Sequence, residues 1–71
     1  MLRTGTVEFF KDDKGYGQIR PDEPGKEVFV HHSAIVGQGD RPTLARGDRV
    51  EYELIDNDPR GPRAKTAKKI D

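Results

Sequence analysis

Polar and apolar side chains alternate over several short stretches of this 71-residue chain. The alternation is unbroken over residues 49–54, where Val50, Tyr52 and Leu54 take every second position. Successive side chains of a strand point to opposite faces, so this pattern predicts a half-buried strand. Apolar residues do not recur at helical spacing over any long stretch. The pattern therefore predicts an all-β chain.

Eight glycines and five prolines divide the chain into short pieces. Strands are predicted at residues 6–11, 15–20, 27–32, 49–55 and 63–70. Residues 33–35 fit one helical turn with Ser33 as its cap, and residues 36–43 and 57–62 are predicted to be turn-rich loops, the first of them mobile. Five short strands with such turns favour a small closed or nearly closed barrel, because closure removes exposed edges.

The size and charge of the chain narrow the function classes. A length of 71 residues predicts one domain over 1–71. Thirteen basic residues balance thirteen acidic ones, so nucleic-acid binding would need a local patch. The absence of cysteine excludes disulfides and thiolate zinc sites. The start has no signal-peptide hydrophobic region and no stretch is long enough to cross a membrane, so we expect a cytoplasmic protein without a membrane partner.

Two kinds of candidate site are weak. The carboxylate pairs at residues 12–13 and 22–23 lie in polar turns, where nothing nearby would bury one of them and raise its pKa for acid–base catalysis. We therefore expect no enzyme and no small-molecule substrate. His31 and His32 are adjacent and, as strand neighbours, should point to opposite faces. With no cysteine and no third histidine, a metal site is not expected.

The middle of the chain is predicted to expose aromatic rings. Alternation directs three apolar side chains inward: Ile19, Val28 and Val30. It directs four others outward: Tyr16, Gln18, Phe29 and His31. Every nucleobase has a π-face, and stacking is worth about 1–3 kcal/mol per base, so outward rings indicate a surface for unpaired bases. The alternative is a second small core packed under a loop.

Three segments resemble motifs of the bacterial cold-shock proteins. Residues 14–19 read Lys-Gly-Tyr-Gly-Gln-Ile, similar to the family's Lys-Gly-Phe-Gly-Phe-Ile. Residues 28–33 read Val-Phe-Val-His-His-Ser, similar to Val-Phe-Val-His-Phe-Ser. Residues 5–11 are similar to the opening Gly-Thr-Val-Lys-Trp-Phe-Asn. With like residues following at Leu44, Gly47 and Val50, the resemblance runs nearly end to end.

The resemblance implies a small five-stranded antiparallel OB-type barrel that binds single-stranded RNA and DNA. It further implies an RNA chaperone that prevents secondary structure, in some members a transcription antiterminator, working as a monomer without a cofactor. Carried over by position, the stacking residues are Phe9, Tyr16, Phe29 and His31, and the phosphate contacts are Lys14 and Arg60. Strict alternation would place Phe9 inside the barrel with Val7. The family pattern places this position on the binding face, which requires an irregular strand there, and we follow the family pattern.

The departures from the family all fall on the predicted binding face. Phe9 replaces a tryptophan, Gln18 and His32 replace phenylalanines, and Asp40 stands near the position of a loop aromatic. Glu8 replaces a basic residue and would repel phosphate, whereas Lys11, in place of an asparagine, adds a charge nearby. Three remaining rings at about 1–3 kcal/mol each, less the cost of ordering the strand, predict micromolar or weaker binding.

The departures from the family leave alternative interpretations open. Gln18 and His32 could contact base edges, which trades affinity for sequence preference. Histidine titrates between about pH 5 and 8, so His32 would tighten binding in mild acid. The barrel could instead be a protein-interaction module or a ribosome-associated OB domain whose aromatic surface has been reduced.

Overall fold

Five strands and one short 3-10 helix form the computed structural model, which describes residues 2–37, 43–55, 58–59 and 61–70. In chain order the elements are β1 (Leu2–Lys11), β2 (Tyr16–Pro21), β3 (Val28–His31), η1 (His32–Ala34), β4 (Arg49–Ile55) and β5 (Arg63–Lys69). All five predicted strands are present. β1 begins before the predicted residue 6 because its first half pairs with β4, from Leu2 opposite Glu53 onward. The predicted loops 36–43 and 57–62 lie partly outside the described residues.

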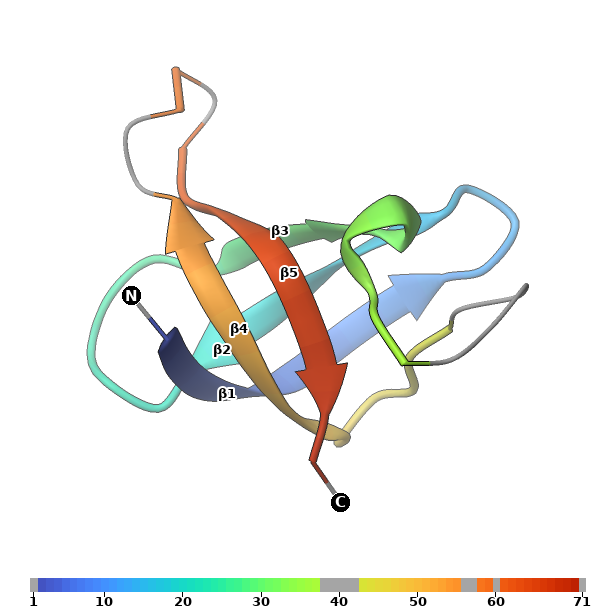
Figure 1. Ribbon diagram of the computed structural model, residues 1–71, viewed down its shortest axis with the longest axis horizontal. Coiled ribbons are helices and arrows are strands. Elements are labelled where there is room, and N and C mark those ends of the chain that lie inside the picture. Colours follow the sequence, from blue (N-terminus) through green and yellow to red (C-terminus); the bar gives the residue numbers. More distant parts are fainter. Residues whose placement is uncertain (1, 38–42, 56–57, 60, 71) are drawn as a thin grey trace.

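The strands close into a barrel in the order β1-β2-β3-β5-β4, as Figure 1 shows. The predicted all-β, OB-type barrel is therefore confirmed. One strand pair differs from the expected antiparallel arrangement: β3 and β5 run parallel, with Phe29 opposite Arg63. The other four pairings are antiparallel, so β1, β3 and β5 all run in one direction while β2 and β4 run in the other. The barrel closes between β3 and β5, which are therefore parallel neighbours. This junction is short, and the Phe29 N–H donates to the Pro62 carbonyl at 3.0 Å.

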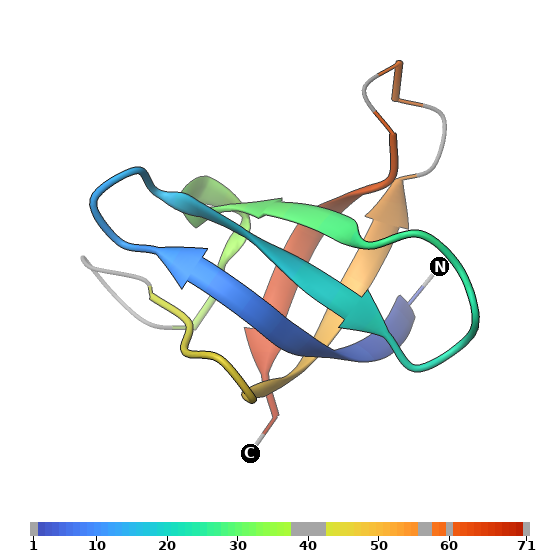
Figure 2. The ribbon, with the colours of Figure 1, turned by 180° about the vertical axis from the view of Figure 1, so that it is seen from behind.

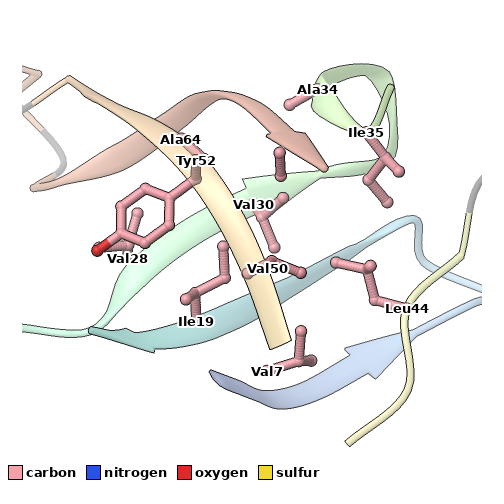
Figure 3. Packing of buried hydrophobic residues seen from close by; sticks show 11 residues of the cluster. Val7, Ile19, Val28, Val30, Ala34, Ile35, Leu44, Val50, Tyr52 and Ala64 are labelled. Carbon is pink, nitrogen blue, oxygen red and sulfur yellow. The ribbon is translucent and has the colours of Figure 1, made fainter. Parts of the chain in front are cut away.

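The inward side chains of all five strands fill the barrel (Figure 3). The buried residues are Val7, Ile19, Val28, Val30, Ala34, Ile35, Leu44, Val50, Tyr52, Ala64 and Ala67. The predicted inward positions on β2, β3 and β4 are thus confirmed, and Phe10 and Leu54 pack against the same cluster. Burial of this apolar surface is the largest favourable contribution to the stability of a domain without disulfides.

Tyr52 is the largest fully buried side chain, with 1% of its surface exposed. Its hydroxyl has no hydrogen-bond partner within the described part of the chain. Burial raises the pKa of Tyr52 above its ordinary value, because the phenolate would lose its hydration. The ring contributes to packing, while the hydroxyl carries an uncompensated desolvation cost.

Two glycines shape the hairpin between β1 and β2. Gly15 has a φ of 79° at the end of the tight turn, where its N–H donates to the Lys11 carbonyl at 2.7 Å. Gly17 is buried, and a Cβ there would lie 2.2 Å from the Phe9 carbonyl oxygen. The absence of a side chain at Gly17 therefore lets β2 approach β1 closely.

The 3-10 turn η1 follows directly from β3. The predicted cap, Ser33, is wrong: Ser33 lies inside the turn and His31 caps it. The Ser33 N–H donates to His31 Nδ1 at 3.3 Å, and the Ser33 hydroxyl lies 2.9 Å from the same nitrogen. In the described ranges, no helix has the length and hydropathy that spanning a membrane requires.

Candidate functional site

The outward face of β1, β2 and β3 carries an accessible pair of aromatic rings. In Figure 2 these strands (blue, teal and green) lie side by side toward the viewer. Tyr16 and Phe29 stack there, with ring centroids 5.7 Å apart and planes inclined by 26°. Phe29 is 41% exposed and Tyr16 is half-buried. The predicted outward direction of both rings is confirmed, and they do not form a second core under a loop.

A β-bulge brings Phe9 to the same face. Val7 pairs with Ile19, but the next paired residue on β1 is Phe9, opposite Gln18, so Glu8 is the extra residue. The extra residue reverses the alternation beyond it. Val7 therefore points into the core while Phe9 shares the side of Gln18. The irregular strand that the family pattern requires is confirmed.

Lys11 adds a positive charge next to these rings. Its ammonium nitrogen lies 5.8 Å from the ring centroid of Phe9 and 5.9 Å from that of Tyr16. Both distances fall within the range of a cation–π interaction. Lys14 is exposed in the following turn. The aromatic face is thus bordered on its β1 side by two cationic groups that a polyanion could approach.

His31 and His32 lie closer together than predicted. Their ring centroids are 4.3 Å apart and the ring planes are inclined by 38°. The expectation that they point to opposite faces is wrong, because His32 leaves the strand and begins η1. His31 stays in the ladder opposite Tyr16, whereas the His32 ring approaches Gly15. Among the described residues, no three His, Cys, Asp or Glu side chains group to hold a metal.

A groove extends from the aromatic face across β3 toward the start of β5. Its described lining residues are Gln18, Lys26, Glu27, Phe29, His31, Ser33, Asp58, Pro59, Gly61, Pro62 and Arg63. Arg63 Nε lies 2.8 Å from Asp58 Oδ2 and so forms an ion pair at the far side. Arg60, the second predicted phosphate contact, and Asp40 lie outside the described residues.

Sequence reasoning missed several lining residues of this groove. Lys26 and Glu27 precede β3 in a polar stretch that carries no distinguishing signal. Residues 58, 59 and 61–63 reach the groove through the parallel pairing of β3 with β5, which no local pattern indicates. The groove gathers the Phe29 ring, the Lys26 cation and the Gln18 amide, and an aromatic surface beside cations is the combination that binds single-stranded nucleic acids.

Comparison with known protein families gives one match over nearly the whole chain. The family described as 'Cold-shock' DNA-binding domain matches residues 3–70. The cold shock-like protein CspLB of Listeria monocytogenes is 45% identical over 69 residues, which cover 97% of this chain and 100% of that protein. The cold shock-like protein CspE of Escherichia coli is 50% identical over 60 residues, 84% of each chain.

Among solved structures, the chain is similar to the one titled "drosophila Unr CSD456". The TM-score is 0.79 at 21% sequence identity, and the match covers 100% of this chain and 27% of that one. At this identity the likeness concerns the fold alone. It is consistent with the closed five-stranded barrel described above.

Proposed function

Because the chain belongs to the cold-shock DNA-binding domain family, whose members bind nucleic acids, we propose that it binds single-stranded RNA and DNA by stacking. The bound strand lies across β1, β2 and β3. The one observation that carries this proposal is the stacked pair of Tyr16 and Phe29 on the outside of the barrel. A flat, accessible ring in that position offers an unpaired base a surface on which it can stack.

Each predicted residue then has a role. Phe9, Tyr16, Phe29 and His31 stack with successive bases. Lys11 and Lys14 contact phosphates, and the position of Arg60 carries the same role by resemblance. Gln18 contacts base edges, and the His32 ring supports that of His31, 4.3 Å away. Support comes from the shared outward side of Phe9, Tyr16, Gln18 and Phe29 and from the exposed position of Lys14.

The proposed binding gives the protein an RNA chaperone activity. A strand held on the aromatic face cannot pair, so mass action shifts hairpins toward the open form. The same effect on a terminator hairpin would produce antitermination. The step uses no cofactor, no ATP and no catalysis, and the proposed acting unit is a cytoplasmic monomer made of this single domain.

Truncation of one ring tests the proposal. Phe29→Ala should weaken binding of an unstructured oligonucleotide by about 1–3 kcal/mol, because one stacking partner is lost. Ile70→Ala is the matched control, since Ile70 is also an exposed hydrophobic residue but lies after β5. Fluorescence anisotropy with labelled oligo-dT and oligo-U measures both variants. Equal affinities for the two variants would contradict a stacking site.

The salt dependence of binding separates phosphate contacts from a protein partner. Each phosphate contact on a single strand gives a slope of log K against log salt of about −0.7. Lys14→Ala should make that slope less negative by about one contact while base preference stays the same. Binding that is insensitive to salt in both proteins would favour a protein ligand instead.

A further inference from the structure

Gln18 occupies the centre of the aromatic face. In the strand ladder it lies opposite Phe9 on β1 and opposite Phe29 on β3. Tyr16 is two residues earlier on β2 and so shares its side. A base stacked on any of these rings would have an edge close to the Gln18 amide. The neighbouring outward positions carry the rings of Phe9, Tyr16, Phe29 and His31, and Arg20 follows on β2.

The amide of Gln18 has no hydrogen-bond partner in the part of the chain that the structure describes. It carries two N–H donors and one carbonyl acceptor, and the neighbouring ring carbons satisfy none of them. The side chain is half-buried and lines the groove that leads toward β5. A half-buried polar group without a partner is costly to cover with a ligand that cannot hydrogen-bond, and favourable to cover with one that can.

We propose that Gln18 is the specificity-determining residue of this surface, and that it hydrogen-bonds the edge of a stacked adenine. The inference rests on the proposed binding of single strands. A site built only of rings tolerates any base, because every base has a π-face. An amide in the middle of the rings adds a requirement for an adjacent donor and acceptor on the base edge.

Adenine fits that requirement best. Its N6 amine donates and its N7 accepts, which matches the oxygen and the NH2 group of an amide in a bidentate pair. The N6 and N1 atoms present the same pair on the other edge, so adenine can lie on the rings in either orientation. Guanine offers two acceptors, N7 and O6, on one edge and an adjacent donor and acceptor, N1–H and O6, only on the other, so it fits in a single orientation. The single ring of a pyrimidine covers less aromatic surface.

His32 is not in a position to share this role with Gln18. It belongs to η1, its ring approaches Gly15, and it has no place in the β2–β3 ladder. His31, the other nearby polar ring, already uses Nδ1 to accept the Ser33 N–H. Of the two residues that sequence reasoning assigned to base edges, the structure therefore favours Gln18.

The test compares two homopolymers that differ only at the base edge: oligodeoxyadenosine, and the same length of deoxynebularine, a purine without the N6 amine. Homopolymers make the binding register irrelevant. The proteins are the wild type, Gln18→Met, which keeps the length of the side chain without its hydrogen bonds, and Gln18→Phe, which supplies a ring. Circular dichroism checks that each protein is folded.

The wild type should bind oligodeoxyadenosine about five- to tenfold more tightly than oligodeoxynebularine. Gln18→Met should reduce that ratio to less than about twofold. Gln18→Phe should reduce it equally while binding both ligands at least as tightly as the wild type, because it adds a stacking ring. A loss of structure in Gln18→Phe would weaken the binding of both ligands. Lower discrimination together with undiminished affinity therefore has to come from the exchanged side chain.

An unchanged ratio in all three proteins would overturn the role of Gln18 while leaving the proposed stacking site intact, provided that Phe29→Ala still weakens binding. Failure of the wild type to bind either homopolymer would overturn both the site and the role of Gln18. If Gln18→Met is unfolded, Gln18→Phe alone decides the outcome.

Discussion

Asp22 and Arg49 join the end of β2 to the start of β4 through two parallel hydrogen bonds. Arg49 Nη1 donates to Asp22 Oδ1 and Nη2 donates to Oδ2, each at 2.6 Å. The Thr4 hydroxyl donates to the same carboxylate at 2.7 Å, which adds β1 to the arrangement. The hydrogen bonds from Arg49 and then Thr4 hold the pKa of Asp22 well below its ordinary value of 3.8.

This lowered pKa makes a prediction about acid stability. Because the folded carboxyl is the stronger acid, its contribution is complete above the unfolded pKa of 3.8 and is lost as the pH falls toward the folded value. Asp22→Asn should therefore give a shallower dependence of the free energy of unfolding on pH below about 4 than the wild type. Urea unfolding at a series of pH values measures it. Parallel curves for the two proteins would contradict the linkage.

Removal of the buried hydroxyl at Tyr52 should not destabilise the barrel. Tyr52→Phe keeps the ring and deletes a group that has no hydrogen-bond partner in the described part of the chain. We expect the free energy of unfolding to stay equal or to rise by up to about 1 kcal/mol. Tyr16→Phe is the control, because that hydroxyl is on the outer face and its loss should leave stability unchanged. A loss of more than about 1 kcal/mol in Tyr52→Phe would mean that the hydroxyl is hydrogen-bonded in solution.

The charge at the β1 bulge should oppose nucleic-acid binding. Glu8 is the extra residue between Val7 and Phe9, next to a proposed stacking ring. Glu8→Gln removes a negative charge beside the proposed binding face, so affinity for the oligonucleotide should rise about two- to threefold at low salt and less at high salt. Glu51→Gln on β4 removes the same charge from a strand outside the aromatic face and should have no such effect. Equal changes in both variants would point to overall charge rather than position.

Sequence alone predicted those features that depend on neighbours along the chain. The inward direction of Ile19, Val28 and Val30 and the outward direction of Tyr16 and Phe29 follow from the two-residue period of a strand, which is a local property. The place of Phe9 did not follow from that period. It came from the resemblance, and the physical cause is the bulge at Glu8.

The tertiary structure decided what depends on contacts between distant segments. The parallel pairing of β3 with β5 brings Pro62 and Arg63 beside Phe29. The pairing of β2 with both β1 and β3 places Gln18 between Phe9 and Phe29. The closeness of the His31 and His32 rings likewise requires β3 to end at His31. Alternation assigns a side chain to a face, but only the pairing of strands determines which side chains on that face become neighbours.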